Sequence, residues 1–365
     1  MTIILFVVIL GVLVLVHELG HFLIAKRAGV KVEEFGFGYP PRAATLGFWK
    51  GTRFSLNWIP FGGFVKIFGE NYEEGAETDE SSRGGTKFAN VSKVWQALIL
   101  AAGVLFNIIF AWLLFTSTFI VGMPTSKEND MGLPVKNAEL MIVSVLPDSP
   151  ADKAALKSGD KIISISKEGK VLQALTPESV SDFIQSSKGP VVLEVKRGDQ
   201  NTEVKISPEE GIAADKKIIG ITMDEVGILR LNPLRAVWEG LKTTINLFYL
   251  TVIGILSLIG GAVTGTADLS QVTGPVGIVG LVGDASRLGI TYLLTFTALI
   301  SINLAVVNLL PFPALDGGRL VFVAIEAITR KKIKPTIAQW VNMVGFGALL
   351  LLMAIITIKD IKNLF

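Results

Sequence analysis

Both histidines of this chain fall in one short run, His17-Glu18-Leu19-Gly20-His21, inside a strongly apolar N-terminal segment. Residues four apart share one face of a helix, so the two imidazoles are placed to bind one metal ion, with Glu18 beside them to act on a water molecule. An ordinary buried pair of hydrogen-bonded histidines is the simpler alternative. Ionisable groups at membrane depth are costly and usually functional, so the pattern favours a catalytic metal centre.

The composition is that of a membrane protein. Half of the 365 residues are hydrophobic and 18% are charged, whereas an ordinary soluble domain carries about 25% charged residues. The net charge of +2 is small, and no basic run is interleaved with aromatic residues, which argues against a nucleic-acid partner. The chain has no cysteine, so disulfides, thiolate nucleophiles and cysteine metal ligands are excluded.

Four segments are long and apolar enough to cross a bilayer as helices, which takes about 20 residues. The first lacks the basic start and cleavage site of a signal peptide and is expected to be retained. Basic residues follow the first segment (26–31) and precede the last (330–334), and the positive-inside rule assigns both clusters to the cytoplasm. The hydrophilic block Ser126–Arg235 is then extracytoplasmic. The predicted spans are Ile3–Ala25, Val94–Val121, Ile290–Leu310 and Ile337–Ile358.

A third protein ligand must complete a catalytic zinc site, and without further histidine or cysteine it must be a carboxylate. Asp316 is the strongest candidate, because it follows the third span in the run Pro311-Phe312-Pro313-Ala314-Leu315-Asp316-Gly317-Gly318. The prolines interrupt the helix and the glycines permit close backbone approach. The alternative is that Asp316 merely caps the helix that follows.

A fifth apolar segment, Leu234–Gly261, is predicted to lie at the membrane interface or to re-enter it. Its start is polar, and a full crossing would reverse the next span and carry Asp316 away from the histidines. We therefore divide the chain into an N-terminal membrane part, an extracytoplasmic module, an interfacial helix with its linker, and a C-terminal membrane part. Their predicted bounds are 1–125, 137–226, 234–272 and 273–365.

The segment Thr52–Phe68 is predicted to form a re-entrant β-hairpin. Its β-branched and aromatic residues flank a turn signal that contains Gly62 and Gly63. Its edge would let an extended substrate add as a strand. The alternative is an interfacial hairpin that anchors Trp58 and Phe61 in the headgroups. The acidic stretch Glu70–Lys87 that follows is expected to be a flexible loop.

The extracytoplasmic block changes to a pattern of short strands and two helices, which predicts a compact α+β module. One helix opens at Ser149-Pro150 and is expected to end near Gly159; the second begins at Pro177. The predicted strands are Met141–Leu146, Lys161–Ser166, Val191–Lys196 and Thr202–Ile206.

Three motifs together resemble the site-2 protease family of intramembrane zinc proteases, of the bacterial regulator-of-sigma-E protease type. They are HELGH in the first span, Gly103-Val-Leu-Phe-Asn107 in the second and NLLPFPALDGG in the third, and Thr273-Gly274-Pro275-Val276-Gly277 strengthens the match. The resemblance implies that His17, His21 and Asp316 bind Zn²⁺ and that Glu18 is the catalytic base. It also implies that Asn308 and Asn107 lie near the substrate backbone, and that a re-entrant β-loop receives the substrate.

The inserted module resembles a PDZ domain over the run from Ser149 to Ile165. The best-known bacterial member of the family has two such domains in tandem, whereas this chain has room for one. A small α/β insert without peptide binding is the alternative. We expect the module to admit single-pass membrane proteins already shortened by another protease, such as an anti-sigma factor or a signal-peptide remnant.

The predicted protein is therefore a polytopic α-helical protein of the bacterial inner membrane with four spans, the re-entrant hairpin and the interfacial helix. The PDZ-like module is extracytoplasmic, and the active site lies within the bilayer toward the cytoplasm. A metal transporter is the main alternative, since intramembrane His and Asp also line ion pathways. No ladder of further ligands continues through the predicted spans, however. A membrane-tethered PDZ adaptor with a relic metal site would not need a complete catalytic set.

Overall fold

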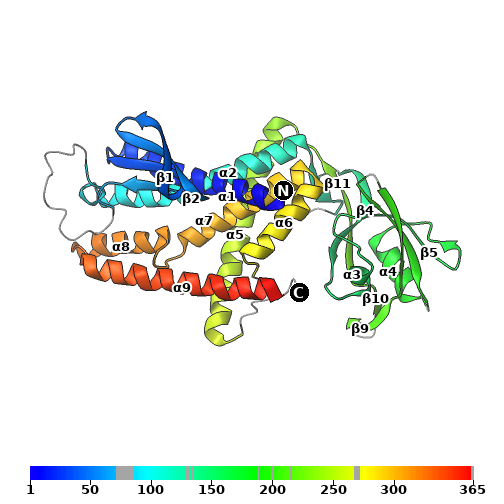
Figure 1. Cartoon of the computed structure of the whole chain (residues 1–365). Coiled ribbons are helices and arrows are strands. Elements are labelled where there is room, and N and C mark those ends of the chain that lie inside the picture. Colours follow the sequence, from blue (N-terminus) through cyan, green and yellow to red (C-terminus); the bar gives the residue numbers. More distant parts are fainter. Residues whose placement is uncertain are drawn as a thin grey trace. The chain divides into compact units, whose positions relative to one another are not determined.

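The computed structural model describes residues 1–70, 86–128, 132–133, 135–187, 189–198, 200–213, 216–266 and 272–362. Most of the predicted loop Glu70–Lys87 lies outside these residues. The chain forms two compact units, one comprising Met1–Ser117, Leu234–Arg287 and Leu293–Phe365, the other Thr118–Pro233 and Leu288–Tyr292. The long helices are α1 (Thr2–Arg27), α2 (Lys93–Val121), α5 (Pro233–Thr264), α6 (Pro275–Leu288), α7 (Ile290–Leu309), α8 (Asp316–Thr329) and α9 (Pro335–Lys362) (Figure 1).

Within the described residues, five helices are long and apolar enough to cross a membrane: α1, α2, α5, α7 and α9. The four predicted spans are confirmed as helices, with ends that differ from the predicted ones by a few residues. The fifth, α5, also meets the criterion of length and composition, although none of its most apolar stretch is buried in the protein. The chain is therefore a multi-pass membrane protein that combines helices with β-sheets.

Helices α1 and α2 pack with their backbones in contact. The buried positions of α1 recur every three or four residues, as one face of a helix requires: Ile9, Leu13, His17, Gly20 and His21. A Cβ atom at Gly20 would lie 2.4 Å from the carbonyl oxygen of Ala102 on α2. Only a glycine therefore permits this approach, which brings the polar run of α1 against the middle of α2.

The segment Thr52–Phe68 is not a hairpin, contrary to the prediction. Residues Thr52–Ile67 form one long strand, β2, which pairs with β1 (Val32–Trp49). The turn between them is the two-residue loop Lys50-Gly51, where both φ angles are positive (46° and 78°), as tight hairpin turns require. The Gly62-Gly63 signal instead lies inside β2, where the strand changes course.

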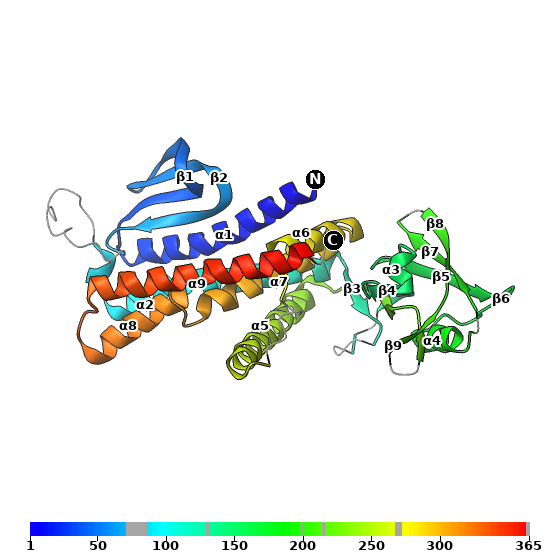
Figure 2. The ribbon, with the colours of Figure 1, turned by 60° about the horizontal axis from the view of Figure 1, so that its bottom comes forward.

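Both strands are bent, so that residues 34–37 of β1 pair on one side with 53–56 and on the other with 63–66 of β2. The segments lie in the order 63–67, 32–37, 53–56 and 44–49. Segment 63–66 consequently forms one edge of the sheet among the described pairings. The sheet packs against α1, with β2 making most of the contact (Figure 2).

A tight bend connects α7 to α8. A Cβ atom at Gly317 would lie 2.2 Å from the carbonyl oxygen of Leu310, so the first turn of α8 folds directly onto the end of α7. The side chain of Asn342 on α9 accepts a hydrogen bond of 3.1 Å from the backbone amide of Ala314 in the bend. The start of α8 is thereby fixed by its neighbours on both sides.

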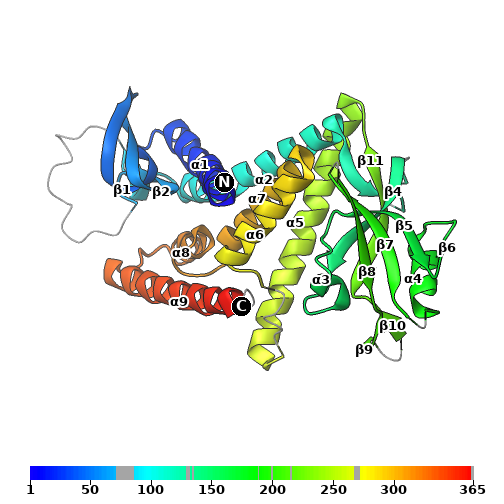
Figure 3. The same cartoon turned by 45° about the vertical axis from the view of Figure 1, so that its right-hand side comes forward.

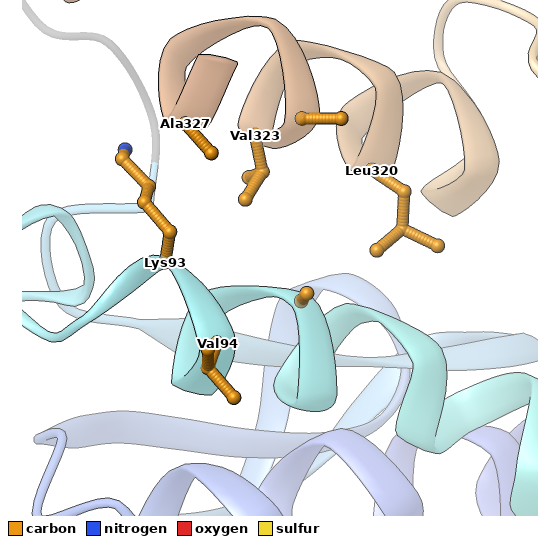
Figure 4. Close-up of a pocket in the computed structure, with 7 residues that line it drawn as sticks. Lys93, Val94, Leu320, Val323 and Ala327 are labelled. Carbon is orange, nitrogen blue, oxygen red and sulfur yellow. The ribbon is translucent and has the colours of Figure 1, made fainter. Parts of the chain in front are cut away.

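Two ion pairs attach α8 to other parts of the first unit. Arg319 pairs with Glu70 at the end of the sheet, and the buried Glu326 pairs with Lys93 at the start of α2. Between α2 and α8 lies an apolar groove, shown in Figure 4. It is lined by Lys93, Val94, Ala97, Leu320, Val323, Ala324 and Ala327.

Helix α6, which was not predicted, contacts the end of α9 at its first residues and the start of α1 near its other end. Asp360 in the last turns of α9 accepts hydrogen bonds from the backbone amides of Gly274 (3.3 Å) and Gly277 (2.8 Å). Near the other end of α6, a Cβ atom at Gly283 would lie 2.9 Å from the side chain of Thr2. These contacts give the Thr273–Gly277 run a structural role, because it starts α6 beneath a buried carboxylate.

The second unit is a seven-stranded antiparallel sheet with two short helices, α3 (Pro150–Lys153) and α4 (Pro177–Gln185) (Figure 3). The four predicted strands are confirmed. Helix α3 ends at Lys153, so the prediction that it continues to near Gly159 is wrong. The strands are β3 (Met123–Ser126), β11 (Ile221–Leu229), β4 (Lys136–Val145), β5 (Lys161–Lys167), β7 (Val191–Arg197) and β8 (Gln200–Ile206) in spatial order, with β6 (Lys170–Val171) beside β5 and a separate pair, β9 (Glu209–Ala213) and β10 (Lys216–Ile218).

Candidate metal centre

The side chains of His17, His21 and Asp316 meet in the first unit, although Asp316 is 299 residues from His17. The Nε2 atoms of the two histidines are 3.1 Å apart. One carboxylate oxygen of Asp316 lies 2.9 Å from Nε2 of His17 and 3.3 Å from Nε2 of His21. The three predicted ligands therefore face one another around a common point.

These separations suit a zinc ion. Ligand atoms about 2.0–2.1 Å from a tetrahedral ion are roughly 3.3 Å from one another, close to the observed separations. Two imidazoles and one carboxylate are also a known donor set for catalytic zinc, which keeps a fourth position open. Both histidines are buried, with exposed fractions of 7%, so a cation there would be largely shielded from bulk water.

Asp316 is the first residue of α8, and Leu315 before it occupies the capping position without a side-chain hydrogen bond. The alternative that Asp316 caps this helix is therefore wrong. Its carboxylate is directed to the histidines by the tight bend after α7, which depends on the close approach at Gly317.

Helix α2 provides a hydrogen-bonding partner for the Nδ1 atom of each imidazole. The Nδ1 atom of His21 lies 2.8 Å from the carbonyl oxygen of Ile99, and Nδ1 of His17 lies 3.2 Å from the side-chain amide of Asn107. Between these positions, a Cβ atom at Gly103 would lie 2.4 Å from Nε2 of His21 and 2.6 Å from Cε1 of His17. Asn107, predicted to lie near the substrate, is thus fully buried against His17.

Gly103 is a functional candidate that the sequence interpretation did not single out. The sequence does place Gly103 four residues before Asn107, and residues four apart share one face of α2, so this spacing is the signal that connects the two. Which side chains that face meets depends on tertiary packing.

Glu18 is partly exposed beside the metal centre and faces the sheet. Its carboxylate interacts with the backbone of Val65 in β2. A Cβ atom at Gly63 would lie 3.9 Å from Cγ of Glu18. The edge segment 63–66 therefore passes over the candidate base, and Gly63 lies in that segment.

Two further predicted residues, Gly62 and Asn308, are close in the sequence to Gly63 and to Asp316, respectively. Gly62 has a φ of +94°, a conformation that favours glycine, and a Cβ atom there would lie 3.0 Å from the ring of Tyr39. Asn308 is in the last turn of α7, shortly before the bend that carries Asp316, and is partly exposed. Among the described residues, the side chain of Asn308 makes no hydrogen bond.

Comparison with known proteins identifies the family of this chain. The family model for peptidase family M50 matches residues 5–352. A chain from Clostridium perfringens that is named as a zinc metalloprotease is 34% identical over 351 residues, covering 96% of this chain and 95% of its own length. The zinc metalloprotease RasP of Geobacillus kaustophilus is 30% identical over 440 residues, covering 100% of this chain and 98% of its own. The regulator of sigma-W protease RasP of Bacillus subtilis is 30% identical over 443 residues, covering 100% and 99%.

This chain belongs to peptidase family M50. It is a zinc metallopeptidase of the site-2 protease type, and its activity is intramembrane proteolysis. The resemblance seen in the sequence is confirmed at the level of the family. The metal-transporter alternative is not favoured, because the relatives are named as proteases.

Gly103→Ala should weaken zinc binding, because the new methyl group would displace both imidazoles. We expect a loss of affinity of about 10–100-fold, the range seen for changes just outside the ligand shell. Gly11→Ala is a matched control, since a Cβ atom there meets no heavy atom within 4 Å. Chelator competition measures both variants; equal affinities for the two would contradict the close contact at Gly103.

Proposed function

We propose that His17, His21 and Asp316 hold the catalytic zinc of this intramembrane endopeptidase and that Glu18 is its general base. The convergence of three ligand atoms within 4.8 Å of one another, from opposite ends of the chain, is the observation that supports the assignment most strongly. When bound, zinc acidifies an attacking water and polarises the scissile carbonyl.

The chain's own residues account for the proton transfers. Glu18 lies beside His17 on the face of α1 that meets the sheet, where its carboxylate accepts a proton from the attacking water and delivers it to the leaving amine. Asn308 donates a hydrogen bond to the substrate backbone or to the developing oxyanion. Burial of the ligands excludes most bulk water from the centre, which strengthens these electrostatic interactions.

Glu18→Gln should retain zinc but lose turnover, because the amide cannot accept the proton. We expect the cleavage of a transmembrane peptide to slow by about 10²–10⁴-fold or more. Asp316→Asn should instead lose zinc, as measured by metal analysis. Glu239→Gln, a carboxylate on α5 in a partly exposed ion pair with Lys242, is the control for the removal of a charge. Full activity of Glu18→Gln would contradict its role as the base.

The edge of the sheet beside Glu18 is the proposed site where the substrate unwinds. A helical substrate hides its carbonyl groups in internal hydrogen bonds and must become extended before attack. Segment 63–66 has its partner on one side only among the described pairings, so its free side can hydrogen-bond an extended chain. Gly62 and Gly63 allow close packing in this segment, because a Cβ atom at Gly62 would lie 3.0 Å from the ring of Tyr39 and one at Gly63 would lie 2.9 Å from the carbonyl oxygen of Gly36.

Proline at consecutive positions of this edge, Phe64→Pro and Val65→Pro, should slow cleavage while zinc remains bound. Because successive amides of a strand point to opposite sides, one of the two variants removes a donor from the free side. Leu46→Pro, in the segment at the opposite edge of the same sheet, is the control. If both edge variants cleave as fast as Leu46→Pro, the sheet serves as a membrane anchor instead.

The path of α6 supports a four-span topology in which α5 does not cross the membrane. His17 and His21 lie in the C-terminal half of α1, and Asp316 follows the C-terminal end of α7 after a short bend. The two helices therefore run in the same direction, and the chain between α2 and α7 must cross an even number of times. Helix α6 contacts the last turns of α9 and the start of α1, and both of these helix ends are extracytoplasmic in this topology. Its 14 residues span about 21 Å, less than a bilayer core of about 30 Å. Helix α5 then begins and ends on the extracytoplasmic side.

The absence of natural cysteine allows this topology to be tested with single-cysteine variants. Leu234→Cys and Thr264→Cys, at the two ends of α5, should both react with a membrane-impermeant maleimide added outside intact cells or spheroplasts. Lys331→Cys, on the basic cytoplasmic loop, should react only after permeabilisation. Labelling of Thr264→Cys only after permeabilisation would show that α5 crosses the membrane.

The substrates are proposed to be single-pass membrane proteins that another protease has already shortened. The name of the relative in Bacillus subtilis, regulator of sigma-W protease, makes an anti-sigma factor one class to test; a signal-peptide remnant is another. The second unit is proposed to be a PDZ-like, extracytoplasmic filter that rejects bulky ectodomains. Its antiparallel sheet and two short helices are compatible with such a module.

Removing the filter should allow uncut precursors to be cleaved. Ser126 of β3 and Val226 of β11 are register partners, so residues 127–225 can be replaced by an Asn-Gly turn that keeps this strand pair. Cleavage of full-length and pre-shortened substrates is then compared in the deletion variant and the parent. If the deletion variant cuts pre-shortened substrate but still rejects the precursor, the filter proposal fails.

A further inference from the structure

We infer that the apolar groove between α2 and α8 binds one acyl chain of an anionic phospholipid, and that the loop after α8 holds the phosphate group of that lipid. Residues 330–334 form this loop and are called the basic loop. The site lies outside the proposed catalytic machinery and requires neither the zinc ligands nor the catalytic base.

The groove opens on a surface whose side chains suit contact with lipid. On α8, Val321, Ile325 and Ile328 are exposed, and their spacing of three or four residues places them on one side of the helix. On α2, Val94 and Leu98 are exposed at the same spacing, and α2 is long and apolar enough to cross a membrane. Hydrocarbon chains are therefore the molecules that surround the mouth of the groove.

The walls of the groove are apolar. Its volume of about 410 Å³ lies in the range of about 300–1,000 Å³ that is common for small-molecule sites. Walls of this kind gain van der Waals contacts when a hydrocarbon chain lies between them, and they offer no partner to a polar group. The apolar lining residues are Val94, Ala97, Leu320, Val323, Ala324 and Ala327.

One end of the groove is polar. Lys93, the first residue of α2, is the charged member of the lining and lies near Ala327 rather than near Leu320 (Figure 4). Lys93 pairs with the buried Glu326. Glu326 also accepts a hydrogen bond of 2.8 Å from the backbone amide of Ile333. The basic loop is therefore attached to the end of the groove where Lys93 lies.

The basic loop presents positive charge that the described residues do not neutralise. Helix α8 ends at Arg330, whose φ of +55° turns the chain out of the helix. Because Lys93 already pairs with Glu326, that carboxylate does not offset the charges of the loop. Basic groups next to a membrane helix attract anionic headgroups, by about fivefold in affinity for each charge. The exposed cations, without an ion pair among the described residues, are Arg330, Lys331, Lys332 and Lys334.

A phospholipid matches this combination better than a protein helix does. It joins an unbranched apolar chain to a phosphate at one end, as the groove joins apolar walls to cations at one end. A helix with its side chains is about 10–12 Å wide. The ion pair between Lys93 and Glu326 bridges α2 and α8, so a helix would have to break it to enter, whereas a single chain can lie along the groove.

Photocrosslinking of the full-length protein tests the site without any variant. The protein is reconstituted in phosphatidylcholine vesicles with a trace of phosphatidylglycerol that carries a diazirine in one acyl chain. Phosphatidylcholine with the same chain is the matched probe, and α5, whose most apolar stretch is not buried, is the internal reference for bulk lipid. Mass spectrometry maps the labelled peptides.

Relative to α5, phosphatidylglycerol should label residues 93–97 and 320–327 at least about fivefold more than phosphatidylcholine does. Raising the salt concentration from about 0.1 to 1 M shortens the Debye length from about 10 to 3 Å and should remove this preference. Equal labelling of the groove by the two lipids at low salt, or labelling by neither, would overturn the inference.

Charge variants test the basic loop. Replacing its three lysines by glutamine should abolish the preference for phosphatidylglycerol, because each lysine contributes about fivefold. The control replaces three exposed lysines of the second unit and should keep the preference. An unchanged preference in the first variant would show that the loop does not hold the phosphate. The two sets are Lys331, Lys332 and Lys334 in the loop, and Lys153, Lys157 and Lys170 in the control.

A filled groove should exclude the chain. Ala324→Phe puts a large side chain on the wall of the groove, and exclusion of even two methylene groups lowers affinity by about tenfold. Ile325→Phe is the matched control, since Ile325 is exposed and does not line the groove. Equal labelling of residues 93–97 by phosphatidylglycerol in both variants would contradict insertion of the chain.

A protein in the groove would give a different result. Because the chain has no natural cysteine, Ala324→Cys carries a single thiol on the groove wall. It should form no disulfide under oxidation, either with a second copy or with a transmembrane peptide that carries a cysteine. A disulfide with either would assign the groove to that protein and overturn the inference. None of these readouts depends on zinc or on cleavage.

Discussion

The close packing of α1 against α2 determines whether the metal centre can form. Two imidazoles and a carboxylate lie about 3 Å from one another among apolar helices, an arrangement that is costly unless the polar atoms are compensated. Gly20 allows the two backbones to touch, and Gly103 leaves room for both rings. A larger residue at either position would separate the helices or displace the rings, and would weaken the metal centre.

The remaining parts of the first unit fit around this contact. The bend after α7 turns Asp316 toward the histidines, and the edge of the β1–β2 sheet passes over Glu18. Ion pairs from Arg319 to the end of the sheet and from Glu326 to α2 attach α8, which carries the carboxylate, to both neighbours. The ligands, the proposed base and the proposed substrate edge are thus held by one network of contacts.

The sequence predicted the parts of this arrangement that follow from local spacing or from the small number of histidine and cysteine residues that could bind a metal. His17 and His21 share a helical face by spacing alone. Asp316 was identified because a chain with two histidines and no cysteine needs a carboxylate as third ligand, and Asp316 directly follows the third predicted span. The β-sheet was predicted less well. Gly62-Gly63 is a strong local turn signal, but the pairing of residues 63–66 with 34–37 outweighs it and leaves both glycines inside a strand. Gly103 and helix α6 were missed because their roles depend on the residues packed against them.

X-ray absorption spectroscopy of the zinc-loaded full-length protein would identify the metal ligands. Ligation by His17, His21 and Asp316 predicts a first shell of nitrogen and oxygen at about 2.0–2.2 Å, without sulfur, and outer-shell scattering from two imidazoles. Because the chain has two histidines, this result would assign His17 and His21 without further variants, and a His17→Ala variant should show at most one imidazole. Zinc bound by fewer than two imidazoles in a preparation that cleaves substrate would show that the two histidines do not both hold the catalytic ion.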